Sequence, residues 1–183
     1  MAGFRSITPN ININTTSGQL RTELLNTFTR LDGSLALAPY QLSSFLGPVG
    51  NGAGTESTLD STTITTGTLA KSASSILIFA CGKTTANANN KTLRLKFGGV
   101  ELFTTGAQAF NGVDWTLNAE IVRTSSTTQT TWIQFFSTAT LTQKITVTTS
   151  SVNLANNQTI LFTGEGTLAN DISLYYHKMT LLT

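Results

Sequence analysis

The sequence predicts a mainly β protein: an antiparallel β-sandwich of jelly-roll topology, preceded by a short N-terminal arm and helix. Three observations support this class. Charged residues make up 11% of the chain, well below the roughly 25% of ordinary globular domains. Threonine takes much of their place, and its β-branched side chain fits a pleated surface. From residue 55 onward, polar turns join short apolar runs, without the helices that separate the strands of a parallel sheet.

Residues 1–17 form a polar arm. Ile11 and Ile13 alternate with asparagine residues, and this period of two would let the arm add as a strand to the edge of another sheet. A frayed terminus is an equally good interpretation. The arm contains no apolar segment of the kind found in secretory signals.

Residues 18–38 carry the only helical period in the sequence. Ser17 suits the N-cap, and Asp32 with Gly33 provides an end near Leu31. A helix of about four turns is marginal in isolation, so its apolar face must dock on something. Its own β domain, the same helix of a symmetry mate and a larger partner are all candidates. The apolar face consists of Leu20, Leu24, Leu25, Phe28, Leu31 and Leu35.

A glycine-rich segment follows the helix. Residues 47–54 read GPVGNGAG, which is the composition of a flexible linker. We therefore predict three parts. An arm and amphipathic helix for attachment or trimerisation cover residues 1–46, the linker covers residues 47–54, and the β-sandwich covers residues 55–183.

The β domain is predicted to contain eight or nine strands. The clearest pair is a hairpin in which residues 93–97 and 100–103 flank Gly98 and Gly99, because two glycines suit a turn with positive φ. The remaining predicted strands are residues 58–66, 75–81, 115–121, 132–136, 141–149, 159–163 and 171–182.

Two of these strands are apolar on both faces. In residues 75–81, Ile76 and Ile78 lie on one face, and Leu77 and Phe79 lie on the other. Such a strand is normally covered on both sides, and the last strand has the same property. We therefore expect a homo-oligomer. The possible subunit interface consists of Ile76, Ile78, Tyr175 and Met179.

The sequence predicts no catalytic site, no metal site and no cofactor. The chain has one histidine, His177, and one cysteine, Cys81. We interpret the histidine as a packed or surface residue and the cysteine as a small buried hydrophobe. The nine acidic residues are spread singly, whereas metal sites need clustered ligands. Aromatic residues that can line a sugar site, but more often fill a core, are Trp115, Trp132, Tyr175 and Tyr176.

The charge pattern argues against two classes of partner. The net charge is +2 and the basic residues are scattered, whereas binding along nucleic-acid phosphates needs a basic stripe. The longest apolar stretch, residues 75–81, is far shorter than the ~20 residues that span a bilayer. We therefore expect no nucleic-acid partner and no membrane partner.

One part of the sequence resembles known proteins. Residues 81–103 read CGKTTANANNKTLRLKFGGVELF, Asn111 and Gly112 lead to Trp115, and residues 119–124 read AEIVRT. Over about residues 75–135, this pattern resembles head-decoration and fibre-like virion proteins of tailed bacteriophages. The resemblance implies a trimeric jelly roll, similar to tumour-necrosis-factor-type folds, that an N-terminal arm and helix attach to the particle.

The resemblance further implies a non-enzymatic structural function in the virion. We expect a homotrimeric capsid decoration, or cement, protein that binds the major capsid protein and stabilises the shell. A fibre or spike component whose head binds a receptor or glycan is the alternative, although a helix of roughly 30 Å is short for a shaft. A polysaccharide-degrading enzyme is a third class. The expected attachment or trimerisation residues are Ile11, Ile13, Leu20, Leu24, Phe28 and Leu31.

Overall fold

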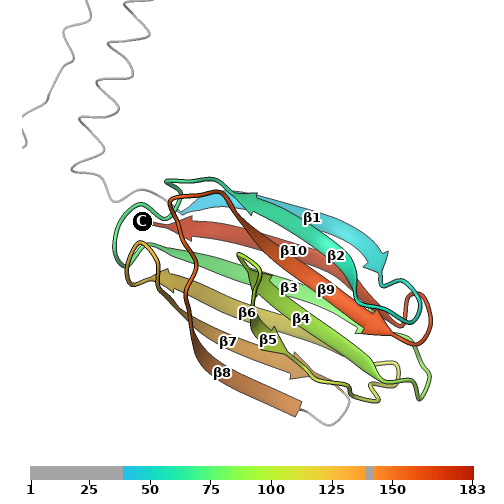
Figure 1. The fold of residues 1–183 in the computed structure, drawn as a ribbon. Coiled ribbons are helices and arrows are strands. Elements are labelled where there is room, and N and C mark those ends of the chain that lie inside the picture. The colour runs from blue at the N-terminus through green and yellow to red at the C-terminus, as the bar shows by residue number, and fades with distance from the viewer. Residues whose placement is uncertain (1–38, 139–141) are drawn as a thin grey trace, which may run out of the picture. The chain divides into compact units, whose positions relative to one another are not determined.

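The computed structural model describes residues 39–138 and 142–183, which belong to a compact unit spanning Ala38–Thr183. Within these residues the chain forms ten strands and no helix, arranged in two antiparallel sheets (Figure 1). The prediction of a mainly β fold is therefore confirmed. The predicted arm and helix lie outside the described residues, and so do Ile11, Ile13, Leu20, Leu24, Phe28 and Leu31.

Six strands form the larger sheet. They are β1 (Tyr40–Gly50), β3 (Ser75–Thr84), β6 (Asp114–Arg123), β7 (Gln129–Ser137), β8 (Thr142–Ser150) and β10 (Ile172–Leu182). Across the sheet they follow the order β1-β10-β3-β6-β7-β8. Every neighbouring pair is antiparallel, and β1 and β8 form the two edges.

Four strands form the smaller sheet. They are β2 (Ser57–Ile64), β4 (Lys91–Phe97), β5 (Val100–Thr104) and β9 (Gln158–Gly166). Their order is β2-β9-β4-β5. Apolar side chains of both sheets meet in a single core, an arrangement that is compatible with the predicted β-sandwich.

Alternation of buried and outward side chains along the strands creates most of this core. In β4, Leu93, Leu95 and Phe97 are fully buried, whereas Arg94 and Lys96 between them turn to the opposite side. A period of two places successive side chains on opposite faces of a sheet. The period that predicts this strand in the sequence is therefore confirmed.

The predicted hairpin turn is also confirmed. Phe97 pairs with Val100, which leaves Gly98 and Gly99 as a two-residue turn between β4 and β5. Their φ angles are +54° and +81°. Glycine adopts this left-handed backbone conformation at little cost, whereas residues with a Cβ are strained there.

The strands pair in a nested order. β1 pairs with β10, β2 with β9, β3 with β6, and β4 with β5. β7 and β8 continue from β6 and extend the larger sheet at one side. Segments far apart in the sequence thus lie side by side (Figure 1). Long-range strand pairing therefore decides which residues share a face of the larger sheet.

The predicted linker is wrong. Residues 47–50 belong to β1, and a β-bulge between Leu46 and Val49 accommodates Gly47 and Pro48. Proline is tolerated there because β1 is an edge strand and needs fewer ladder hydrogen bonds. Asn51 follows, 2% exposed, and its main-chain N donates to the Ile172 carbonyl at 3.0 Å.

The glycines of this segment serve close packing. A Cβ on Gly47 would lie 2.6 Å from the Phe45 ring, and a Cβ on Gly50 would collide with Asn170 Oδ1. Residues 47–50 therefore have the composition of a linker but form part of an ordered strand. The β domain therefore begins before Tyr40, and not after residues 47–54 as predicted. This start agrees with the compact unit Ala38–Thr183.

Candidate interaction surface

The larger sheet has one face packed on the core and one face turned away from it, which we call the outer face. Antiparallel register places its outward side chains in rows that cross the strands. One row contains Thr180, Leu77, Glu120, Trp132 and Val147, and the next contains Lys178, Phe79, Asn118, Gln134 and Ile145. The rows bring together residues of β10, β3, β6, β7 and β8.

Apolar side chains are concentrated on the outer face. Nine large hydrophobic residues are exposed in the described part of the chain. Six of the nine lie on this face: Leu46, Leu77, Phe79, Trp132, Ile145 and Val147. Monomeric proteins seldom group exposed apolar side chains in this way unless the surface binds something.

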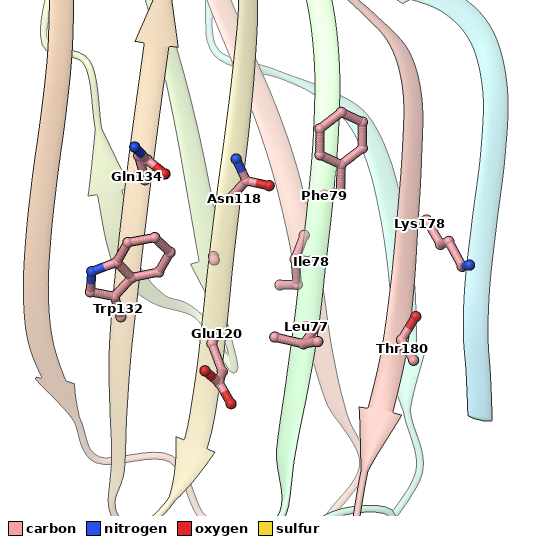
Figure 2. Close-up of a pocket in the computed structure, with 10 residues that line it drawn as sticks. Leu77, Ile78, Phe79, Asn118, Glu120, Trp132, Gln134, Lys178 and Thr180 are labelled. Atoms are coloured by element: carbon pink, nitrogen blue, oxygen red, sulfur yellow. The ribbon is translucent and has the colours of Figure 1, made fainter. Parts of the chain in front are cut away.

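An open hollow of about 420 Å³ lies on the outer face. Figure 2 shows its lining: Trp132 and Gln134 on β7, Asn118 and Glu120 on β6, Leu77 and Phe79 on β3, and Lys178 and Thr180 on β10. The Trp132 side chain is 41% exposed and that of Phe79 is 39% exposed. The hollow therefore offers aromatic surface with amide and charged groups beside it.

Two side chains of opposite charge flank the apolar strip on β3. Glu120 pairs in register with Leu77 and accepts a hydrogen bond from Ser75 Oγ at 2.7 Å. Lys178 pairs in register with Phe79 from the other side. Neither charge forms a salt bridge within residues 39–138 and 142–183. Within the described part of the chain, neither charge is therefore neutralised by an opposite charge.

The corresponding face of the smaller sheet is different. Arg94 lies 2.8 Å from Glu165, 3.3 Å from Glu101 and 3.6 Å from Glu56. Lys96 also binds Glu56, and this hydrogen bond is the main reason that the pKa of Glu56 is lowered. This face pairs its charges internally, as a surface in contact with water does.

The predicted subunit interface needs correction. Ile76, Ile78 and Met179 are buried in the core, with exposures of 0%, 2% and 0%. The large apolar residues of β3 that face outward are Leu77 and Phe79. A strand that is apolar on both faces does not reveal, from its own sequence, which face meets the core.

The four aromatic residues considered for a sugar site separate in the structure. Trp115 is 2% exposed and belongs to the core, whereas Trp132 lies on the outer face. Tyr175 is 43% exposed at the β-bulge of β10. Tyr176 packs against Phe79 with ring centroids 6.1 Å apart. Only Trp132, with Phe79 near it, contributes to the hollow.

A second cluster surrounds the single histidine, between β1, β2 and β10. His177 Nε2 lies 3.2 Å from Ser43 Oγ. Its Nδ1 lies 3.3 Å from Asp60 Oδ2, without an aligned hydrogen bond. The ring stacks between Phe45 and Phe162, with centroids 5.9 Å from each. β-bulges beside Ser43 and Asp60 turn both side chains toward the ring.

Burial controls the chemistry of this cluster. His177 is 1% exposed, and burial lowers its pKa, although the Asp60 carboxylate opposes the shift. A Ser-His-Asp relay uses these residue types, but it needs an aligned hydrogen bond between histidine and aspartate. His177 lies between three strands, and its burial confirms the interpretation of a packed histidine.

A third cluster orders the asparagine-rich loop before β4. Lys91 is fully buried, and its Nζ donates to Asn87 Oδ1 at 2.7 Å and to the Asn89 carbonyl at 2.9 Å. Asp171 accepts hydrogen bonds from Nδ2 of Asn87 and Asn89 at 2.7 and 3.1 Å. Burial raises the pKa of Asp171, but these hydrogen bonds lower it overall. Burial lowers the pKa of Lys91.

Across residues 39–138 and 142–183, no three His, Cys, Asp or Glu side chains are placed to hold a metal ion. In the same residues, no helix has the length and apolar character needed to cross a bilayer. Cys81 is partly exposed rather than fully buried as predicted, and burial raises the pKa of its thiol.

The chain was compared with known protein families, with curated proteins and with solved structures, and no family model, curated protein or solved structure matches it. The resemblance to phage virion proteins therefore rests on the sequence phrases themselves. In the structure those phrases form the loop that Lys91 orders, the hairpin of β4 and β5, and the strand β6.

Proposed function

We propose that the protein is a non-enzymatic structural component of a phage virion, namely a homotrimeric capsid decoration protein that binds the major capsid protein and stabilises the shell. The observation that carries this proposal is the difference between the two outward faces of the β domain. One pairs its charges within the chain, and the other exposes six large apolar side chains. This difference would be expected if the face with paired charges is in contact with water and the apolar face is in contact with another protein.

The strand order supports a jelly-roll topology for the domain. In a jelly roll, the first strand pairs with the last, and the pairing continues inward to a central hairpin. The pairs β1–β10, β2–β9, β3–β6 and β4–β5 follow that scheme. β7 and β8 would then be an addition to one sheet. The virion resemblance implies the same topology.

Attachment to the shell would use the predicted N-terminal arm and helix. Apolar burial contributes about 25 cal/mol per Å², and ordering of the arm offsets part of that gain. Three arms on one trimer would act together, so that weak contacts add up to slow release. This division leaves the β domain to hold the subunits together.

A reconstitution experiment tests the function. Capsids that lack the protein are incubated with the purified full-length chain, and bound protein is measured after sedimentation together with the thermal stability of the shell. We expect saturable loading in multiples of three copies and a higher melting temperature of the shell. No loading at high micromolar concentration would contradict the proposal.

A fibre or spike head that binds a glycan is the second candidate. The observation that favours it is the Trp132 ring beside the amides of Asn118 and Gln134 (Figure 2). An aromatic face can stack on the apolar side of a sugar while amides bond its hydroxyl groups. Binding to host cells or to a glycan array, lost in Trp132→Ala, would support this candidate over the first.

A further inference from the structure

We infer that the free edge of β8 pairs with β8 of a second copy of this chain, and that the two strands join antiparallel about a two-fold axis at Thr146. The inference goes beyond the proposed function and does not depend on it. Two-fold pairing cannot build a trimer, so it would join neighbouring trimers of the proposed decoration protein. Three observations lead to it: an unpaired edge, the lack of protection on that edge, and a register that is complementary to itself.

One edge of β8 is unpaired in the described part of the chain. Among the described strands, β8 is the last of the larger sheet and pairs only with β7 (Figure 1). Along such a strand, every second residue turns its N–H and C=O groups away from the sheet, where another strand can bind them. β8 therefore offers a template that is nine residues long.

The two edges of the larger sheet differ in their protection against pairing. Natural β proteins protect exposed edges with proline, bulges or charged side chains, and β1 contains Pro48 and two register shifts. β8 contains neither proline nor glycine, and it pairs with β7 without a register shift. Its single charge belongs to Lys144, whose Nζ donates to the Thr104 carbonyl of the smaller sheet at 2.6 Å and lies 5.1 Å from the centre of the Phe103 ring. β8 is therefore the edge that is suited to pairing.

The sequence of β8 is complementary to itself in the register that pairs all nine residues. That register places Thr146 opposite Thr146 of the second copy, at the two-fold axis. Ile145 then lies opposite Val147, and Lys144 lies opposite Thr148, so apolar side chains meet and like charges do not. A register centred on Lys144 would pair fewer residues and bring the two lysines together.

Pairing of this kind would also enlarge the outer face. The two-fold axis of an antiparallel edge contact is perpendicular to the sheet, so the outer faces of both copies lie on the same side. Ile145 and Val147, which are 58% and 67% exposed, would adjoin their counterparts at the junction. The contact therefore uses two apolar side chains that a monomer would leave in water at the border of the sheet.

Disulfide cross-linking of the full-length chain tests the contact and its register. Cys81→Ser removes the natural thiol, and single cysteines are then introduced on β8. Thr146→Cys places two thiols opposite each other, with Cα atoms about 4.5–5.5 Å apart, which suits a disulfide. Mild oxidation should therefore convert most of this variant to a covalent dimer. Thr148→Cys is the matched control, because its two thiols would lie about 13 Å apart along the strands, too far to bridge.

A mixture of two variants gives a second test of the register. Chains with Ile145→Cys should cross-link to chains with Val147→Cys much more than either variant cross-links to itself. Neighbouring pairs in an antiparallel ladder alternate between a closer and a wider type. The pair at Thr146 and the pair of Ile145 with Val147 are therefore of different types, so one of the two tests always uses the closer pair.

Sedimentation velocity tests whether the contact forms without a covalent link. Over a range of concentrations, the natural chain should show species related by a factor of two, either monomer and dimer or, if the proposed trimer forms, trimer and hexamer. Val147→Lys adds a charge to the edge and should weaken this association about tenfold or more. Leu46→Lys makes a similar change at an exposed residue of the opposite edge strand and should leave the two-fold association unchanged. Circular dichroism spectra establish that each variant is folded.

Two outcomes would overturn the inference. One is equal cross-linking of the Thr146→Cys and Thr148→Cys chains. The other is a natural chain that shows no species related by a factor of two, or whose association Val147→Lys does not change. In either case, normal loading onto capsids would leave the proposed function in place. Conversely, specific cross-linking through Thr146→Cys in a protein that does not load onto capsids would support the β8 contact and contradict the decoration function.

Discussion

At the scale of single residues, two buried polar clusters link parts of the chain that are distant in sequence. His177 joins β10 to Ser43 on β1 and to Asp60 on β2. Lys91 joins the loop before β4 to Asp171 through two asparagines. Removing one member of such a cluster leaves the others buried without partners, and that penalty exceeds the net gain of any one hydrogen bond.

The histidine cluster predicts a dependence of stability on pH. The pKa of His177 is lowered in the folded chain, whereas an unfolded histidine titrates near 6.5. Below that value the unfolded chain binds the proton more readily, so stability is complete above about pH 7 and falls as the pH drops toward 5. Urea unfolding between pH 5 and 8 measures the effect.

The chain has one histidine, so His177→Gln should remove most of the pH dependence in this window while lowering stability at neutral pH. The same pH profile in the glutamine variant would show that another group causes it. The depressed pKa values of Glu56 and Asp171 predict a separate loss of stability at lower pH, below about 4, where unfolded carboxylates take up protons.

The lysine cluster predicts coupling between Lys91 and Asp171, two buried charged side chains that Asn87 and Asn89 connect. Lys91→Met leaves Asp171 without its compensating charge, and Asp171→Asn does the same to Lys91. Each single change should lower the free energy of unfolding by about 3 kcal/mol. The double variant should lose clearly less than the sum of the two, as measured in a double-mutant cycle. Additive losses would mean that the asparagines, not the charges, order the loop.

At the scale of elements, the β1 strand shows how composition can mislead. Its end contains Gly47, Pro48 and Gly50, residues that usually mark flexible connections. They lie in an edge strand because a bulge admits the proline and because the backbone passes close to Phe45 and Asn170. The same glycines that suggest flexibility are the residues small enough to fit.

This interpretation of β1 predicts opposite results at two neighbouring glycines. A Cβ on Gly50 would collide with Asn170, whereas a Cβ on Gly52 would have its nearest neighbour 3.8 Å away, at Ser57. Gly50→Ala should destabilise the protein by about 1–3 kcal/mol, and Gly52→Ala should be neutral or slightly stabilising. Thermal unfolding of both variants measures the difference. If the two behave alike, residue 50 is not packed in a strand.

At the scale of the whole molecule, the core and the interaction surface belong to one compact unit. The core residues of both sheets all fall within Ala38–Thr183. The two faces turned away from the core differ in charge and in apolar exposure. If the protein associates through the outer face as proposed, stability and association should depend on different sets of side chains.

A truncation tests this separation. A chain starting at Ala38 retains every core residue that the structure describes, so it should unfold cooperatively at nearly the temperature of the full-length chain. If the N-terminal segment provides attachment as proposed, the same truncation should load poorly onto capsids. Differential scanning calorimetry and the sedimentation assay measure the two effects. Full loading of the truncated chain would contradict the assigned role of residues 1–37.

Periodicity predicts the strands well, because alternation depends only on neighbours along the chain. The hairpin at Gly98 and Gly99 is confirmed for that reason. The choice between Ile76 and Leu77 as the buried neighbour on β3 is not predictable in the same way. Both are apolar, and only the position of the second sheet decides which one is covered.

The sequence by itself determined the β class and the tight turn, since these follow from local composition and spacing. The tertiary structure alone decided that β1 is a strand, that His177 lies beside Asp60, and that Leu77, Phe79 and Trp132 share one exposed surface. The physical reason is that strand pairing joins residues with no relation in sequence, and a face exists only after the strands have paired.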